Sequence, residues 1–422
     1  MPYVVRNDVD WQTGLAEQQA PCQQQLQQQI TDSKPDLHAE PAAQQRLQIR
    51  QAQQYATGRG QLVAVIDSGV WPHPSLRGRV TNGGDYIENR TDLFDCDGHG
   101  TAVAGLIAAA PDPTIGFVGV APDARILSIR QASTFYTVPL LHLQDGQSRR
   151  PSAGDTVSMA QAVMRAVQLH ATVINISEAA CFRAGPEQDN APALHAAVHD
   201  AVERNVVVVV AAANTSPTCP QNRPGVVTTI SSPGWFGDDV LTVAATDDTG
   251  QPAAFSIRGP WVAVAAPGTG VVSLADGRAG VTNELLDAHG QAYPLAGTSF
   301  AAPYVAGLAA LVRERFPNLT ARQVTRRIER TAQRPAGSAE RTEDLGYGVI
   351  NPVAALTQVL PEEPGAPAPP VRPARLDGLG VPPGQDTLAR TIALAGSAAA
   401  LGVLGLTLLV VQTVKRHRRS PG

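Results

Sequence analysis

The chain has 422 residues, which is enough for one large α/β domain with appended segments, because such domains often run past about 200 residues. The formal net charge is -4 and charged residues make up 17% of the chain, so no basic surface is available for nucleic acid and we expect no nucleic-acid partner. The hydrophobic fraction of 43% fits a globular core together with one membrane segment.

The first 57 residues are rich in glutamine and show no strand pattern. A helical stretch near residues 44–55 would place Leu47 and Tyr55 on one inner face. We interpret residues 1–57 as an extension that lies over the following domain. The start has no apolar region of the length that a secretory signal needs. Three explanations stay open: the true start lies upstream, another export route is used, or the chain was trimmed.

The first predicted strand covers residues 62–66, a continuous apolar run typical of a strand buried on both faces of a parallel sheet. It ends at Asp67, and α/β sheets usually hold their ligands at this end of their strands. Taken alone, Asp67 is only a residue that caps a strand end. Residues 71–95 predict a turn-rich loop.

A cluster of possible metal ligands follows that loop: Asp95, Cys96, Asp97 and His99. Its spacing matches no familiar zinc pattern, and no second Cys/His group lies close in the sequence, so we predict neither a metal site nor a cofactor. The small apolar residues 101–110 predict a helix packed closely against the sheet. Gly105 would weaken that helix unless a close approach required a glycine there.

Strand and helix patterns alternate through the rest of this region. Strands are predicted at 125–130, 172–177, 206–210, 240–245 and 261–268, and helices at 158–170, 191–204 and 320–332. This alternation is typical of an α/β fold with a parallel sheet.

A glycine turn at Gly297 opens another helix, with Ser299 in its first turn and an apolar continuation to Val312. The N–H groups at a helix start are unpaired and the helix dipole is positive there, so negative charge that develops beside Ser299 would be stabilised. A serine nucleophile needs such a place. An isolated Gly-Thr-Ser before a helix, however, is more often only a helix cap.

Three motifs decide between these interpretations of Ser299: DSG at 67–69, HGTAVAG at 99–105 and GTSFAAP at 297–303. In this order they resemble the signature motifs of the subtilisin-like serine proteases, and the similarity spans roughly residues 60–356. The resemblance implies an α/β, subtilisin-like three-layer fold with a mostly parallel central sheet. A lipase or esterase is excluded, because that serine elbow is Gly-x-Ser-x-Gly after a strand.

The resemblance also implies roles for four residues. Asp67 would orient His99, His99 would act as the general base, and Ser299 would attack the peptide carbonyl. Asn214 would donate a hydrogen bond to the oxyanion together with the Ser299 backbone N–H. Because His99 stands at a helix start, we expect the dipole to keep it neutral.

In this family the segment after the strand at 172–177 pairs with the substrate backbone. We expect five residues to bind substrate: Ser177, Glu178, Ala179, Ala212 and Ala213. Ala179 and Ala213 stand where the family commonly has glycine, which would narrow the cleft and change the shape of the substrate pocket. Glu178 is a candidate for selecting basic substrate residues.

The chain has four cysteines, Cys22, Cys96, Cys181 and Cys219, which permit three pairings. Sequence alone does not choose between them, and four free thiols in a cytosolic protein are the alternative. We favour Cys22–Cys96, which would hold the extension beside the cleft. We also favour Cys181–Cys219, because each cysteine follows a predicted strand at the same end of the sheet. Such disulfides imply an oxidising, extracytoplasmic location.

The protease domain is predicted to cover residues 58–360, followed by a proline-rich linker at 361–388. Residues 389–414 predict a transmembrane helix, because they lack charge after Arg390 and are long enough to cross a bilayer. The tail at 415–422 is basic, so we expect it in the cytoplasm and the protease outside. A buried core helix is the alternative, but this segment has no core to join.

With this spacer, anchor, cysteine set and extension, the chain resembles the mycosins, the membrane-anchored proteases of type VII secretion systems. The resemblance implies a single-pass protein of the cell membrane that cleaves secreted protein substrates and contacts subunits of the secretion membrane complex. Its extension is not expected to be a removable inhibitory propeptide. The alternative function is a scaffold subunit of that complex with little or conditional proteolysis.

Overall fold

The computed structural model describes residues 16–22, 39–137, 152–185, 191–277, 280–334, 341–361, 363 and 387–417. The chain divides into two compact units, Met1–Ala366 and Pro367–Gly422, and we describe each by itself.

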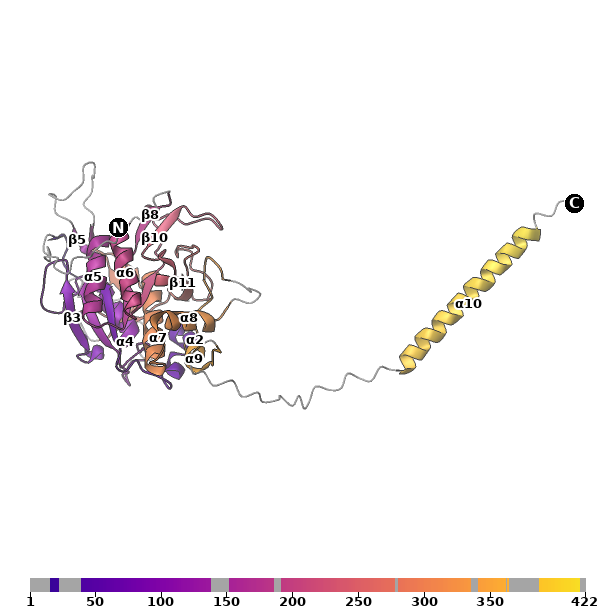
Figure 1. Ribbon diagram of the computed structural model, residues 1–422, viewed down its shortest axis with the longest axis horizontal. Coiled ribbons are helices and arrows are strands. Elements are labelled where there is room, and N and C mark those ends of the chain that lie inside the picture. Colours follow the sequence, from indigo (N-terminus) through magenta and orange to yellow (C-terminus); the bar gives the residue numbers. More distant parts are fainter. Residues whose placement is uncertain are drawn as a thin grey trace. The chain divides into compact units, whose positions relative to one another are not determined.

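A seven-stranded sheet with the order β12-β11-β9-β7-β2-β4-β3 forms the centre of the first unit (Figure 1). Its strands are β2 (Leu62–Asp67), β3 (Val80–Asp85), β4 (Arg125–Arg130), β7 (Val173–Ile176), β9 (Val207–Ala211), β11 (Leu241–Thr246) and β12 (Val264–Pro267). Every neighbouring pair in this sheet is parallel. The predicted parallel α/β sheet is therefore confirmed.

Helices cover both faces of this sheet. They are α4 (His99–Ala108) and α7 (Thr298–Arg315) on one face, and α5 (Thr156–Gln168) and α6 (Pro192–Glu203) on the other. Val63 and Val65 of β2 pack into the core that contains α4 and α7 residues, whereas Ala64 and Ile66 pack into the core with α5 and α6 residues. Both faces of β2 are buried, which explains its unbroken apolar run.

The prediction of a turn-rich loop at 71–95 is wrong in part, because this segment contains β3 and a short 3₁₀ helix, Pro74–Leu76. Strand β3 lies at the sheet edge, and its second half reads Asn-Gly-Gly-Asp, residue types that are depleted in strands. Its pairing with β4 decides its conformation instead.

The extension folds onto the domain as two short helices, α2 (Ala42–Leu47) and α3 (Ile49–Ala52). They are separated by Gln48, whose φ of 53° is left-handed and interrupts the helix. This break separates the two expected inner residues: Leu47 is buried, but Tyr55 is 42% exposed, so the prediction for Tyr55 is wrong. The buried Gln44 amide donates to the Val118 carbonyl at 2.6 Å.

Short antiparallel pairs surround the main sheet. They are β1 (Glu17–Gln18) with β5 (Ser133–Thr137), β5 with β6 (Ser152–Ala153), β8 (Ala180–Arg183) with β10 (Thr229–Ser232), β13 (Ser273–Leu274) with β14 (Val281–Thr282), and β15 (Glu284–Leu286) with β16 (Ala292–Pro294). Three further helical segments are described: the 3₁₀ turn Gly237–Asp239, α8 (Ala321–Thr331) and α9 (Pro352–Thr357).

Both favoured disulfides are present, Cys22–Cys96 and Cys181–Cys219. The first joins residues 74 positions apart and ties the extension to the segment that precedes α4. The second joins residues 38 positions apart, beyond the carboxyl ends of β7 and β9.

The second unit contains one helix, α10 (Thr387–His417), among its described residues. A search of the described residues finds no helix with both the length and the apolar character needed to cross a membrane. The predicted proline-rich linker lies almost entirely outside the described residues, as does most of the predicted basic tail.

Candidate active site

Asp67 and His99 meet at the carboxyl end of β2. Asp67 is the last residue of β2 and His99 is the first of α4, so a strand end and a helix start hold the two side chains. His99 Nδ1 lies 2.7 Å from Asp67 Oδ1, and the same carboxylate oxygen accepts the Ser68 backbone N–H at 2.7 Å. The Asp67 side chain is fully buried while that of His99 is 17% exposed, which leaves the imidazole open on one side.

A second buried carboxylate, that of Asp95, holds the start of α4 in place. It accepts hydrogen bonds from four neighbours: Ser68, Asp97, Gly98 and Thr101. Burial and the nearby Asp97 raise the pKa of Asp95 to about 6. Cys96 is in a disulfide, so the cluster considered above as a metal site offers no thiolate. We interpret Asp95 as a positioning residue for His99.

Ser299 and Asn214 converge above Gly297. A Cβ atom on Gly297 would lie 2.9 Å from Ser299 Oγ and 3.2 Å from Asn214 Nδ2, so a larger residue would crowd both polar groups. Asn214 Oδ1 accepts the backbone N–H of Thr298 at 2.9 Å and its hydroxyl at 3.1 Å. These bonds fix the orientation of the Asn214 side-chain amide. Ser177 Oγ donates to the Ser299 carbonyl at 2.8 Å.

One cavity of about 370 Å³ brings most of the expected site residues together. Its lining includes His99, Ser177, Glu178, Ala179, Ala213, Asn214 and Ser299. Ala213 adopts a left-handed φ of 77°, which is the conformation that a glycine would favour. Ala212 is fully buried in a core cluster and is not among the lining residues.

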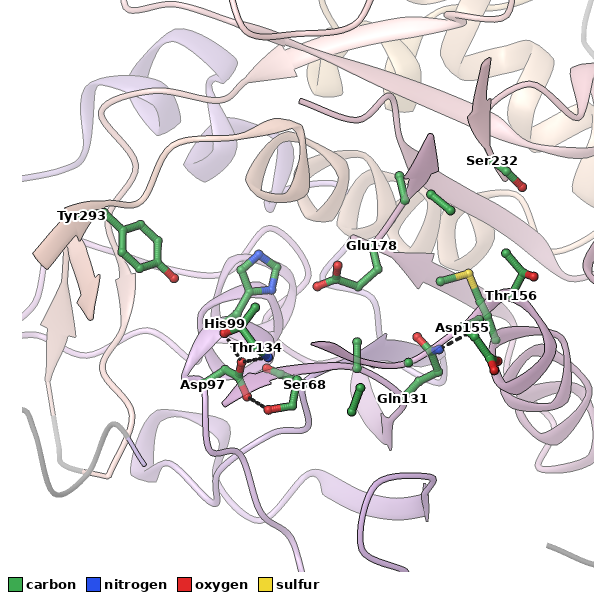
Figure 2. Close-up of a pocket in the computed structure, with 17 residues that line it drawn as sticks. Ser68, Asp97, His99, Gln131, Thr134, Asp155, Thr156, Glu178, Ser232 and Tyr293 are labelled. Carbon is green, nitrogen blue, oxygen red and sulfur yellow. Dashed lines mark hydrogen bonds between the residues drawn. The ribbon is translucent and has the colours of Figure 1, made fainter. Parts of the chain in front are cut away.

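A second cavity, of about 230 Å³, adjoins the first, because His99, Glu178, Ala179 and Tyr293 line both. Figure 2 shows the Glu178 carboxylate pointing toward the His99 ring within this cavity. Asp97 and Tyr293 also line it and were not predicted as site residues. Tyr293 belongs to the β15–β16 hairpin, and nothing in the sequence pattern indicates that this hairpin reaches the site.

The Phe300 ring, also not predicted, lies 4.9 Å from the His99 ring between centroids. Phe300 directly follows Ser299 and belongs to the GTSFAAP motif, so the sequence contained a signal for it. Its contact with His99 depends on the packing of α7 against α4.

Nearby carboxylates decide the charge of His99. Burial opposes protonation of the imidazole, but Asp67, Glu178 and Asp95 together raise the pKa of His99 to about 9. The expectation that the helix dipole keeps His99 neutral is therefore wrong, because full negative charges at close range outweigh the partial charge of a helix end. Burial raises the pKa of Glu178 to about 7, and the charge of His99 opposes that rise.

Three possible metal-ligand atoms, one each from Asp67, His99 and Glu178, lie within 4.8 Å of one another. Asp67 and His99 already bond to each other through Oδ1 and Nδ1. A cation here would compete with that hydrogen bond, so the geometry fits a carboxylate–imidazole pair better than a metal centre.

Comparison with known proteins places the chain in a family. The model of the subtilase family, Peptidase S8, matches residues 58–348. Mycosin-3 of Mycobacterium tuberculosis is 42% identical over 400 residues, covering 90% of this chain and 84% of that protein. Mycosin-1 of the same organism is 43% identical over 387 residues, covering 88% of this chain and 83% of that protein.

Solved structures agree with this result. The crystal structure of MycP1 from the ESX-1 type VII secretion system has a TM-score of 0.74 and 40% identity, covering 85% of this chain and 96% of that chain. A chain in the structure of an intact ESX-5 inner membrane complex has a TM-score of 0.73 and 35% identity, covering 94% of this chain and 95% of that chain. The family model and these relatives each cover well over half of the sequence, and the chain belongs to the subtilase family of serine proteases, in which it is a relative of the mycosins.

Proposed function

We propose that this chain is a membrane-anchored serine endopeptidase that cleaves secreted proteins outside the cytoplasm and supports a type VII secretion complex. One observation carries the catalytic part of this proposal. His99, which is hydrogen-bonded to the buried Asp67, lines the cavity that Asn214 and Ser299 also line. A base, a nucleophile and an amide donor therefore face the same space.

In the proposed mechanism, Asp67 accepts the His99 Nδ1–H bond, which leaves Nε2 free to take the proton of Ser299 Oγ. Ser299 Oγ then attacks the peptide carbonyl, and His99 returns the proton to the leaving amine. A water molecule hydrolyses the acyl-enzyme by the same route. The imidazolium that forms in each step is stabilised by the neighbouring carboxylates.

The oxyanion of each tetrahedral intermediate would be held by the side-chain N–H of Asn214 and the backbone N–H of Ser299. The hydrogen bonds from Thr298 to Asn214 Oδ1 support this role, because they orient the amide before the reaction begins. The position of Ser299 in the first turn of α7 supports it as well, because backbone N–H groups there lack partners within the helix.

A direct test is covalent labelling. A fluorophosphonate probe should label the chain at Ser299, and the label should disappear in Ser299→Ala. Ser216→Ala is the matched control and should keep the label, because it removes a serine hydroxyl that lines the same cavity and bonds to Thr218. Labelling that persists in Ser299→Ala would contradict the assignment of the nucleophile.

The anchoring part of the proposal divides the chain into an extension at 1–57, a protease domain at 58–360, a linker at 361–388, a transmembrane helix at 389–414 and a basic tail at 415–422. The support is chemical. Large apolar side chains of α10 are exposed, including Leu401, Val403, Leu404, Leu406 and Leu409. Exposed apolar surface of this kind favours contact with lipid.

This anchoring is tested by expressing the full chain and a form that ends at residue 366. The full chain should stay with membranes after carbonate extraction, whereas the shorter form should be released. Added protease should digest the catalytic unit only from the extracytoplasmic side, as both disulfides also suggest. Release of the full chain by carbonate would contradict the anchor.

A role in assembly is the second candidate function, and a specific observation favours it. One similar structure is that of the periplasmic assembly from the ESX-5 inner membrane complex, in which the matching chain is 36% identical and covers 84% of this chain. In the native host, Ser299→Ala and a full deletion should be compared for cleavage and for total secretion. Loss of cleavage with continued secretion supports a protease whose fold separately supports the complex. If Ser299→Ala changes neither, while the deletion stops secretion, the chain is mainly a scaffold.

A further inference from the structure

The smaller cavity, of about 230 Å³, is lined by the carboxylate of Glu178. Glu178 is half-buried, and within the part of the chain that the structure describes its carboxylate forms no hydrogen bond or ion pair. One of its oxygens lies within 4.8 Å of ligand atoms of both Asp67 and His99. The carboxylate therefore faces the proposed catalytic centre without a committed partner.

The two other acids that line this cavity are already occupied. Asp97 accepts hydrogen bonds from Ser133 Oγ at 2.5 Å and from the Thr134 backbone N–H at 2.6 Å. Asp155 caps α5 by accepting the Ser158 N–H at 2.7 Å. These bonds occupy both carboxylate oxygens of Asp97 and one of Asp155, which is exposed to water, so among the described residues that line this cavity Glu178 is the half-buried acid available to a ligand.

Among the described residues that line the two cavities there is neither lysine nor arginine, so His99 is the group there that can carry a positive charge opposite Glu178. A half-buried carboxylate without a partner is costly, and burial accordingly raises the pKa of Glu178 to about 7. A cationic group entering the cavity would remove that cost by forming an ion pair. The chemistry of this cavity is thus matched to a cation.

We propose that Glu178 is a specificity-determining residue that selects substrates with a lysine or arginine close to the scissile bond. The inference rests on the proposed protease function. The cavity of about 230 Å³ shares His99, Glu178 and Tyr293 with the cavity that contains Ser299. A peptide whose carbonyl lies at Ser299 therefore places a neighbouring side chain beside Glu178, where the carboxylate accepts hydrogen bonds from an ammonium or a guanidinium group.

Binding of such a side chain would also act on His99. The Glu178 carboxylate favours protonated His99, and a substrate cation paired with Glu178 cancels that influence. The imidazole then loses its proton more readily, which is the state that a general base requires. Compared with an uncharged substrate, a basic substrate would thus bind more tightly. It would also move the fall of kcat on the acid side of the pH profile to lower pH.

Binding measurements separate this inference from catalysis. Ser299→Ala protein is titrated with a peptide series in which one lysine is moved along the sequence, and each peptide is matched by one with norleucine at that position. At one position lysine should bind roughly tenfold more tightly than norleucine, as expected for a partly buried charge pair. The preference should weaken at high salt.

Two Glu→Gln variants in the Ser299→Ala background are then compared. Glu178→Gln should lose the preference for lysine, whereas Glu203→Gln should keep it, because Glu203 is exposed on α6 and pairs with Arg322. Glu178→Lys should reverse the preference toward a glutamate peptide. Thermal melting of each variant checks that it is folded.

Equal binding of the lysine and norleucine peptides at every position, or a preference that survives in Glu178→Gln, would overturn the role of Glu178. Failure of Ser299 to react with the fluorophosphonate probe would instead overturn the protease function and would leave the binding result unaffected. The two failures are therefore distinguishable.

Discussion

At the scale of single residues, the site depends on charge at short range. His99 stands at a helix start, where the dipole disfavours protonation, but the carboxylates of Asp67 and Glu178 lie within a few ångströms of its ring nitrogens. Unit charges at that distance in a partly buried site dominate over a partial charge at a helix end. The pKa of His99 is therefore raised to about 9.

The raised pKa of His99 predicts that kcat/KM falls at an unusually high pH on the acid side of its pH profile. The general base must be neutral, so kcat/KM should rise with pH through about 9 rather than level off near the ordinary histidine value. Glu178→Gln removes an anion that stabilises the imidazolium, which lowers the pKa of His99 and should move this fall to lower pH. The pH profiles of both proteins with an uncharged peptide check this, and identical profiles would contradict it.

A second residue-scale prediction concerns Asn214. Asn214→Ala removes the proposed oxyanion donor and should lower kcat about 10²- to 10³-fold with a small change in KM. Thr298→Val is the matched control: it removes one of the two hydrogen bonds to Asn214 Oδ1 but keeps the backbone bond, so the loss should be much smaller. Steady-state kinetics measure both, and equal losses would mean that the amide only supports the loop.

At the scale of elements, the close packing of α4 depends on Gly105. A Cβ atom there would lie 2.5 Å from Ser273 Oγ and 2.6 Å from Leu274 Cγ, both on β13. The Ser273 hydroxyl also donates to the Ala102 carbonyl of α4 at 2.5 Å. Helix α4 and strand β13 therefore approach each other closely at Gly105, which is the reason we expected for a glycine in this helix.

Gly105→Ala should consequently destabilise the protein although alanine favours helices. The gain in helix propensity is up to about 1 kcal/mol. The overpacking against β13 costs about 1–3 kcal/mol, so we expect a net decrease in the free energy of unfolding. Denaturant unfolding of the Met1–Ala366 unit measures the change. Gly185→Ala is the control, because among the described residues no atom beyond its chain neighbours lies within 4 Å of its Cβ position, and an equal effect of both changes would contradict the packing argument.

At the scale of the whole molecule, the extension is attached to the protease domain by strand pairing, hydrogen bonds, a disulfide and apolar packing, in which Leu47 and Ile49 join the main core. Strand β1 pairs with β5, the Gln44 side chain bonds to Val118, and Cys22 is linked to Cys96. The disulfide sits in a small core cluster with Phe135. These contacts make the extension an integral part of the folded domain.

Opening the disulfides should therefore lower stability. In the chain-entropy model, a bridge between residues 74 positions apart contributes about 4 kcal/mol. We expect Cys22→Ser/Cys96→Ser to lower the melting temperature and to make the extension more sensitive to added protease. Reducing agent should have the same effect on the unmutated protein. An unchanged melting temperature would show that strand pairing, hydrogen bonds and apolar packing hold the extension without the disulfide.

The sequence by itself determined the features that depend on local order. Continuous apolar runs predicted the buried parallel strands, because a strand covered on both faces has no polar side. The three motifs indicated the family, and strand ends on the same edge of the sheet indicated the Cys181–Cys219 pair. The edge strand β3 and the exposure of Tyr55 were predicted wrongly, since sheet pairing and a single left-handed residue decide them.

Only the tertiary structure decided the surroundings of His99. Glu178, Phe300 and Tyr293 come from separate parts of the chain, and the fold alone brings them to one place. Electrostatic effects depend on distance and burial, which no sequence spacing contains. The charge of His99 could therefore not be predicted, whereas the place of Glu178 at the cleft and the residue types needed for catalysis could be.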